Sequence, residues 1–128
     1  MIKISNIPVE NFVEYEDKYG SWNILKLPDT DVGYSYKAFI KPEYRGKGYG
    51  KYHLGLRLEK AREMQLSYLT AYVEIWNNEE RTMLEKYGWV RKEIPDSSFF
   101  HYYIDLYPYN NSMKDLIQVL KGRVEEND

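Results

Sequence analysis

Residues 38–51 read Ala38-Phe39-Ile40-Lys41-Pro42-Glu43-Tyr44-Arg45-Gly46-Lys47-Gly48-Tyr49-Gly50-Lys51. An alternating strand pattern runs up to Ile40, Pro42 ends it, and a helical pattern begins at about Tyr49. The N–H groups of a first helical turn lack partners inside the helix, and the helix dipole adds partial positive charge there. Glycines allow the backbone to approach an anion closely. This order of elements predicts a phosphate cradle made of Arg45, Gly46, Lys47, Gly48, Tyr49, Gly50 and Lys51.

The glycine spacing separates this turn from two other phosphate-binding motifs. A P-loop needs four residues between its first glycine and Gly-Lys-Ser/Thr, and no such arrangement occurs here. A dinucleotide fingerprint reads Gly-x-Gly-x-x-Gly and needs further βαβ units, whereas Gly46, Gly48 and Gly50 are spaced two apart. Both motifs fail. The same glycines would also suit a strand–helix corner that binds no ligand.

The composition excludes several classes of protein. At 128 residues, 43% hydrophobic and 30% charged, the chain suits one soluble domain. It has no cysteine, so a disulfide framework, a thiolate zinc site and a cysteine nucleophile are excluded, and two histidines, His53 and His101, are too few for a histidine metal cluster. The net charge of −2 predicts no binding of nucleic acid or membrane. With no signal-peptide layout and no long apolar run, we expect a cytoplasmic protein.

Hydrophobic periodicity predicts most of the strands. Residues 1–4 resemble a short edge strand, residues 11–19 and 21–27 a hairpin, residues 68–75 a central strand, and residues 89–94 and 99–106 a second hairpin. Residues 32–40 form another strand. Its two-residue period predicts one shared face for Val32, Tyr34, Tyr36, Ala38 and Ile40.

Hydrophobic periodicity and capping residues also predict three helices. In the helix that begins at about Tyr49, the period predicts an apolar side with Leu54, Leu58, Ala61 and Met64, and a polar side with Arg57, Lys60 and Glu63. Residues 79–87 form a short helix with Gly88 as its C-terminal cap. A last helix at residues 111–122 has Ser112 as its expected cap and ends at Gly122.

A second motif lies downstream of the glycine turn. Leu69, Ala71 and Val73 alternate as a strand, Asn77 follows, and a helix then closes at Tyr87-Gly88-Trp89. With residues 45–50, which fit Gln/Arg-x-x-Gly-x-Gly/Ala after Pro42-Glu43-Tyr44, this pattern resembles the GCN5-related N-acetyltransferase (GNAT) superfamily. The two motifs together span about residues 32 to 106.

The resemblance implies an α+β fold: a mixed, mostly antiparallel central sheet with splayed strands, flanked by two or three helices. It divides a single GNAT-like domain, residues 1–124, into reduced N-terminal strands at 1–31, an acetyl-CoA-binding core at 32–106 and a C-terminal helix at 111–122. Residues 125–128 are expected to form a frayed tail.

The resemblance also implies an activity, the transfer of acetyl from acetyl-CoA to an amine, either a small molecule or a lysine of a protein. The CoA diphosphate would bind the amides of residues 46–51, and the pantetheine arm would pair with the strand edge at Ala38, Phe39 and Ile40, where a backbone N–H polarises the thioester carbonyl. Asn77 would contact the arm from the other side.

The sequence departs from the family pattern at two places. Only about 30 residues precede the 32–40 strand, so we expect an open, tyrosine-lined acceptor side that suits a flat or macromolecular acceptor. The family's thiolate-protonating tyrosine falls on Leu84, which leaves Tyr87, one turn further, as the candidate acid. The carboxylate that some members carry falls near Tyr34, which cannot act as a base at neutral pH, so Glu74 is the candidate base.

Two other functions stay open at this stage. A non-catalytic acyl-CoA-binding module on the same fold is favoured by the missing tyrosine at Leu84, because a fold alone never establishes activity. An interaction module that works by occluding a partner would also fit the small size and the tyrosine-rich composition. The sequence leaves open a homodimer formed through an edge strand or the terminal helix.

Overall fold

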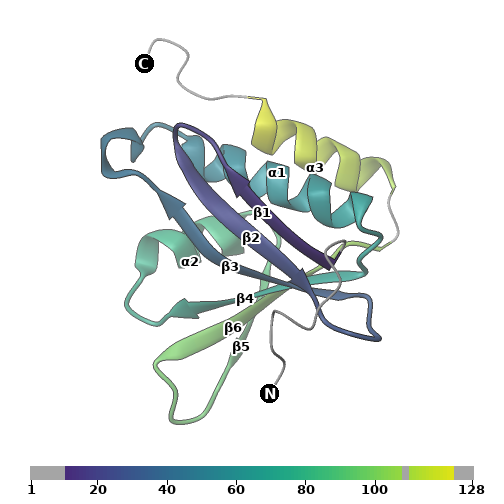
Figure 1. Ribbon diagram of the computed structural model, residues 1–128. Helices are drawn as coiled ribbons and strands as arrows, with labels where there is room; N and C mark the ends of the chain where they lie inside the picture. The colour runs from purple at the N-terminus through teal and green to yellow at the C-terminus, as the bar shows by residue number, and fades with distance from the viewer. Residues whose placement is uncertain (1–10, 108–109, 123–128) are drawn as a thin grey trace.

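The computed structural model describes residues 11–107 and 110–122. In these ranges six strands form one sheet in the order β1-β2-β3-β4-β6-β5, and helices cover it (Figure 1). The strand predicted at residues 1–4 and the tail at 125–128 lie outside the described residues. The elements in chain order are β1 (Phe12–Glu16), β2 (Gly20–Lys26), β3 (Val32–Ile40), the short 3-10 helix η3 (Pro42–Tyr44), α1 (Tyr49–Glu63), β4 (Tyr68–Glu74), α2 (Asn78–Lys86), β5 (Val90–Glu93), β6 (Phe99–Asp105) and α3 (Asn111–Lys121).

The strand pairing confirms the predicted fold class. Neighbouring strands run antiparallel everywhere except at β3 and β4, which are parallel and joined through α1. A parallel pair needs such a crossover because its two strands run in the same direction. Both predicted hairpins, β1–β2 and β5–β6, are also present. The sheet is therefore mixed and mostly antiparallel.

The two central strands diverge after a short parallel contact. β3 has nine residues and β4 has seven, but only residues 32–34 and 68–70 pair with each other. Beyond that point each strand stays with its outer neighbour: β3 follows β2 to the Gly20–Ile40 pair, and β4 follows β6 to the Glu74–Phe99 pair. The predicted splay is confirmed, and it leaves two facing strand edges without a partner strand.

A bulge interrupts β3 near Lys37. The β2 partners Ser21 and Asn23 lie opposite Phe39 and Tyr36, so β3 carries one extra residue there, and Lys37 takes a left-handed φ of 55°. An extra residue shifts the alternation of side chains to the other face. The single face predicted for residues 32, 34, 36, 38 and 40 is therefore wrong beyond Tyr36.

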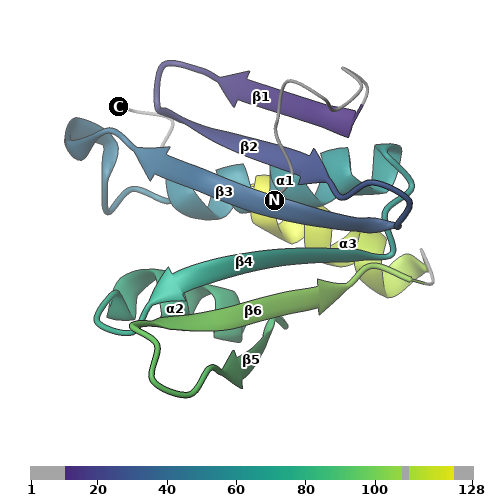
Figure 2. The ribbon, with the colours of Figure 1, turned by 60° about the horizontal axis from the view of Figure 1, so that its bottom comes forward.

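Within the described residues, the three α-helices pack on one face of the sheet and no helix covers the other face (Figures 1 and 2). Helix α1 lies between the sheet and α3, so it is buried on two sides. Arg57, predicted on the polar side of this helix, is in fact only 4% exposed. The prediction was wrong because a helix covered from two directions has no wide solvent face. Within the described residues no helix is both long and apolar enough to cross a membrane.

The helix ends follow local side-chain chemistry. Asn77 caps α2 by accepting a hydrogen bond from the Glu80 N–H, and Gly88 follows its end with a φ of 96°. Helix α3 is capped by Asn110, whose Oδ1 accepts from the Met113 N–H at 3.1 Å, and not by Ser112 as expected. Asparagine is as good a cap as serine, and it stands one residue before the first helical residue. Gly122 ends α3 as predicted.

Gly55 sets the distance between α1 and α3. A Cβ at this position would lie 2.8 Å from Lys121 Cγ and 2.9 Å from Leu120 Cβ. We expect Gly55→Ala to destabilise the protein by about 1–3 kcal/mol, because the two helices must move apart. Thermal unfolding measures this loss. A melting temperature equal to or above that of the wild type would show that the helices are not in tight contact here.

Candidate functional site

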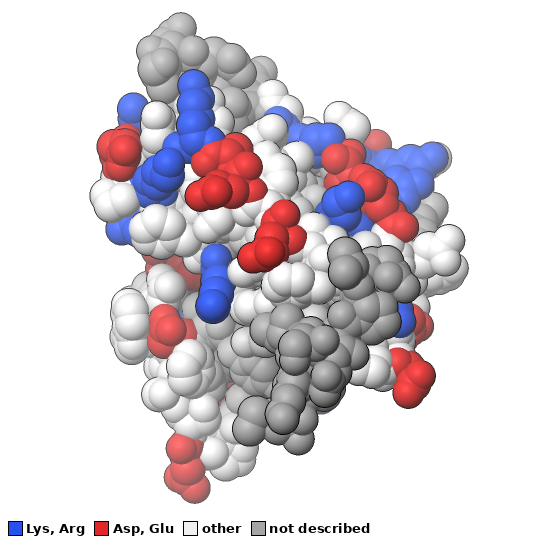
Figure 3. All heavy atoms as spheres, viewed as in Figure 1, with Lys and Arg blue, Asp and Glu red and all other residues white. Residues whose placement is uncertain are grey.

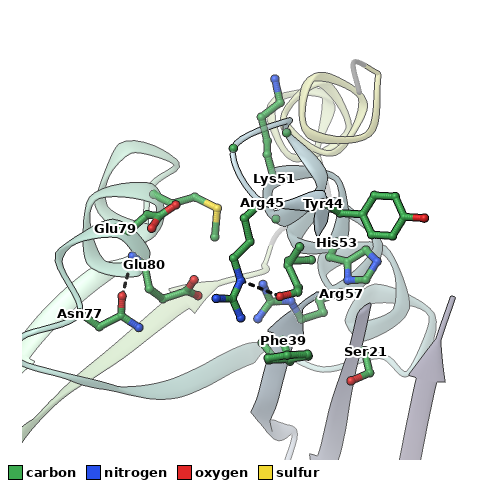
Figure 4. A pocket seen from close by; sticks show the side chains of 16 residues that line it. Ser21, Phe39, Tyr44, Arg45, Lys51, His53, Arg57, Asn77, Glu79 and Glu80 are labelled. Carbon is green, nitrogen blue, oxygen red and sulfur yellow. Dashed lines mark hydrogen bonds between the residues drawn. The ribbon is translucent and has the colours of Figure 1, made fainter. Parts of the chain in front are cut away.

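A pocket of ≈480 Å³ lies where β3 and β4 separate (Figure 4). Its walls are the end of β3, the glycine loop with the first turns of α1, and the start of α2. This volume is typical of sites that bind small molecules and cofactors. The residues that line it are Ser21, Ala38, Phe39, Ile40, Tyr44, Arg45, Gly46, Gly48, Gly50, Lys51, His53, Arg57, Asn77, Glu79, Glu80 and Met83.

The N-terminus of α1 opens on this pocket without a side-chain cap. Gly48 occupies the N-cap position with a φ of 95°, Gly46 has a φ of 78°, and no side chain hydrogen-bonds to the first turn as a cap. A Cβ on Gly50 would lie 3.8 Å from Met83 Sδ and 4.0 Å from Ile40 Cγ1, so Gly50 faces across the pocket. The uncapped turn therefore presents N–H groups and the positive end of the helix dipole to a ligand.

Most of the predicted cofactor-binding residues line the pocket. Arg45 is held at its mouth, where Nε donates to the Ile40 carbonyl at 2.8 Å and the guanidinium lies 5.2 Å from the centre of the Phe39 ring. Two predicted residues do not line it. Tyr49 is 1% exposed with its ring stacked on Tyr19, and Lys47 is half-buried outside the pocket wall.

The wall contributed by α2 begins with Asn77. Its Oδ1 accepts from the Glu80 N–H at 3.3 Å, so the carbonyl side of the amide serves the helix while Asn77 also lines the pocket. Leu84, where the family resemblance places a tyrosine, is 1% exposed in the core. Tyr87 lies ten residues after Asn77, which is about 15 Å along a helix, and it does not line the pocket. The structure does not bring this candidate acid to the site.

Glu74 lies on the face of the sheet opposite to the three described α-helices. It alternates with buried Val73 at the end of β4 and pairs with Phe99, outside the pocket wall. On the same face, aromatic rings form a continuous row across three strands, with centroids 5.1 Å apart for Tyr34–Tyr36, 5.8 Å for Tyr34–Tyr72 and 5.0 Å for Tyr72–His101. Burial raises the pKa of Tyr34, which keeps its hydroxyl protonated at neutral pH. The described residues of this face therefore carry a row of tyrosines, and the assignment of this face to the acceptor stays a prediction.

Sequence reasoning missed a partly buried hydrogen-bonded cluster beside the pocket. His53 Nε2 lies 2.9 Å from Asp17 Oδ2, and Tyr15 donates its hydroxyl to the same carboxylate. Burial lowers the pKa of His53, although Asp17 opposes this shift. Burial would raise the pKa of Asp17, but hydrogen bonds from His53, the Tyr19 N–H and Tyr15 outweigh it and lower the value. Asp17 and His53 are 36 residues apart, so no sequence pattern joins them.

The surface charge is mixed in sign. On the face shown in Figure 3, cationic and anionic side chains alternate over the helices and strands without a large area of one sign. Among the described residues, no three His, Asp or Glu side chains gather in a way that would hold a metal ion.

Comparison with known proteins agrees with this geometry. The model of the acetyltransferase (GNAT) family matches residues 9–89. Because the match covers more than half of the 128 residues, the chain belongs to the GNAT family. A search of curated proteins found no significant match.

Solved structures show the same fold at low sequence identity. A Klebsiella pneumoniae protein assigned as an acyl-CoA N-acyltransferase has a TM-score of 0.71 and 18% identity, over 83% of this chain and 80% of its own. Spermidine N-acetyltransferase SpeG from Vibrio cholerae, as the F149A mutant, has a TM-score of 0.64 and 17% identity, over 79% and 68%. PaiA N-acetyltransferase from Thermoplasma acidophilum, in complex with coenzyme A, has a TM-score of 0.64 and 18% identity, over 74% and 61%.

Gly50 offers a direct test of the pocket. We expect Gly50→Ala to lower the affinity for CoA about tenfold or more, because the added methyl group projects between Met83 and Ile40. The melting temperature is expected to stay the same or rise, since alanine favours a helix more than glycine does. Isothermal titration calorimetry and thermal unfolding measure the two effects. The matched control is Gly55→Ala in the same helix, because Gly55 faces α3 and not the pocket. Unchanged CoA affinity in Gly50→Ala would show that CoA does not bind in this pocket.

His53 generates a prediction about pH. Its pKa lies below the ordinary value of 6.5, so as the pH falls from 7 to 5 the unfolded chain takes up a proton that folded His53 resists. The free energy of unfolding should therefore decrease over this range. His53→Gln, which keeps an N–H donor for Asp17 but does not titrate, should flatten the decrease.

The other histidine, His101, also has a pKa lowered by burial and by Lys92, so His101→Gln is the control for its separate contribution. An equal slope in wild type and His53→Gln would contradict the assignment.

Proposed function

We propose that this chain is an acetyl-CoA-dependent N-acetyltransferase whose acceptor is an amine. The observation that carries the proposal is the pocket between the diverging strands β3 and β4, with the uncapped N-terminus of α1 open on it. Membership of the GNAT family supports the acyl-transfer chemistry. The CoA complex of PaiA, a protein of the same fold, supports CoA as the carrier of the acyl group.

The residues of the pocket fit a CoA molecule along its length. The amides of residues 46–51 would bind the diphosphate, with Arg45 and Lys51 beside it, and Gly50 leaves the room that a side chain would fill. The edge of residues 38–40 has no partner strand toward β4, so it would pair with the amides of the pantetheine arm as an added strand. Asn77 would contact the arm from the wall of α2.

The chain's own groups then account for the transfer step. Acetyl-CoA supplies the acetyl group as an activated thioester. A backbone N–H of residues 38–40, beyond the bulge at Lys37, would donate to the thioester carbonyl as the amine attacks. Glu74, on the open face, would take the proton of the amine, directly or through water. Since Tyr87 lies at the end of α2 that is remote from the pocket, we propose water as the source of the proton for the released thiolate.

The open face bears on the choice of acceptor. The row of Tyr34, Tyr36, Tyr72 and His101 would support a flat acceptor such as a lysine on a protein surface. The spermidine N-acetyltransferase of the same fold supports a small amine instead. A panel of polyamines, amino acids and lysine peptides distinguishes these two acceptor classes.

A second candidate function is a non-catalytic acyl-CoA-binding module. It is favoured by α2, which contains no tyrosine, and by the buried position of Leu84. Such a module would bind acetyl-CoA without releasing free CoA in the presence of any amine.

Release of the CoA thiol tests the proposed reaction. The chain has no cysteine, so a thiol reagent reports the CoA thiol alone. We expect release with at least one amine of the panel, a loss of about 10²-fold or more in Glu74→Gln, and unchanged turnover in Tyr87→Phe. Binding of acetyl-CoA without release would favour the second candidate. Absence of any binding at high micromolar acetyl-CoA would exclude both.

A further inference from the structure

Arg57 is a buried cation that pairs with no carboxylate among the described residues. It is 4% exposed, and its single hydrogen bond to a described residue runs from Nη1 to Ser35 Oγ at 3.2 Å. Its Nε has no hydrogen-bond partner among the described residues, and no carboxylate there lies within ion-pairing distance of the guanidinium. Burial lowers the pKa of Arg57 and the charge of Glu80 opposes the shift, but an arginine stays protonated in proteins. A buried charge of this kind is unfavourable unless a counter-charge reaches it.

The guanidinium lies at the deep end of the pocket. Arg57 and Glu80 point into it from opposite walls, α1 and α2 (Figure 4). Along α1, Arg57 is nine residues from Gly48, or about 13 Å of helix rise, so it is too far along the helix to serve the diphosphate cradle. Along β3, its partner Ser35 lies three residues beyond Ala38, past the bulge. Ser35 itself does not line the pocket, so a ligand arm that enters at the cradle and follows residues 40 to 38 would end facing Arg57.

We infer that Arg57, which is hydrogen-bonded to Ser35, binds a carboxylate at the end of the acyl group, so that the pocket accepts acyl-CoA thioesters of dicarboxylic acids such as malonyl-CoA and succinyl-CoA. The inference rests on the proposed binding of CoA in this pocket. The fork of guanidinium N–H donors matches a carboxylate in two-point geometry, and the hydrogen bond from Nη1 to Ser35 Oγ fixes the position of the guanidinium. Glu80 offsets part of the charge and limits how strongly the site holds the anion.

The carboxylate could belong either to the acyl group or to the acceptor. The face of the sheet on which Arg57 lies distinguishes these two sources. Ser35 and Arg57 are buried on the face that the helices cover. Glu74 and the aromatic row lie on the opposite face, from which the amine would approach. An anion that reaches Arg57 along β3 is therefore carried by the thioester.

The test is calorimetric binding of matched thioesters, which needs no acceptor and no turnover. Malonyl-CoA is compared with propionyl-CoA and succinyl-CoA with butyryl-CoA, because each pair has the same chain length and differs in the carboxylate. We expect the wild type to bind the carboxylate member about tenfold or more tightly. Arg57→Met should bring the ratio close to one and leave the affinity for CoA itself unchanged.

Two further variants test the inference even if Arg57→Met does not fold. Glu80→Gln removes the opposing charge and should increase the preference for the carboxylate member. Lys51→Met, near the cradle, should weaken the binding of all CoA compounds equally and leave the ratio unchanged.

Ratios near one in wild type, with CoA still bound, would overturn the inference and leave the proposed function intact. No binding of CoA would defeat the proposed function itself. A preference that persists in Arg57→Met, or one seen instead for amines that carry a carboxylate, would also overturn the inference.

Discussion

The separation of β3 from β4 is the feature on which the rest of this structure depends. Two parallel strands that have begun to pair would normally continue, because each unpaired backbone group loses a hydrogen bond. Here they part after residues 34 and 70, since each is held by a longer antiparallel ladder on its outer side and β3 is bent by the bulge at Lys37. The unpaired edges face the pocket, so the backbone groups that the sheet leaves free are the groups that we propose a ligand satisfies.

Helix α1, which joins β3 to β4, forms another wall of the pocket with its first turns. Its first turn has glycines where a cap or a side chain would close the pocket, and its middle is buried between the sheet and α3. The same burial brings Arg57 under the sheet, where solvent cannot balance its charge. One helix thus contributes both a dipole at the mouth of the pocket and a full charge at its deep end.

The sequence predicted the parts of the fold and site whose signals are local. The strand, the glycines and the helix of residues 32–63 follow one another directly, and the motif at Asn77 is equally compact. Arg57 was misassigned because periodicity cannot show that α3 covers the far side of α1. The bulge at Lys37 needed the register of β2, and the His53–Asp17 pair needed the hairpin that carries Asp17 beside α1. Tyr87 was a plausible substitute by spacing, and the sequence already placed it at the end of its helix. Only the structure shows that the pocket is lined by the start of α2 and not by its end.

The most direct measurement is a titration of the ¹⁵N-labelled protein with CoA, followed by the amide signals in two-dimensional NMR. If the diphosphate binds the uncapped turn and the arm pairs with the edge of β3, the largest shifts will fall on the amides of residues 46–51 and 38–40, and the amides of residues 38–40 will become protected from exchange. Shifts confined to the aromatic face around Tyr34 and Tyr72, or saturation with no shift in residues 46–51, would contradict the account.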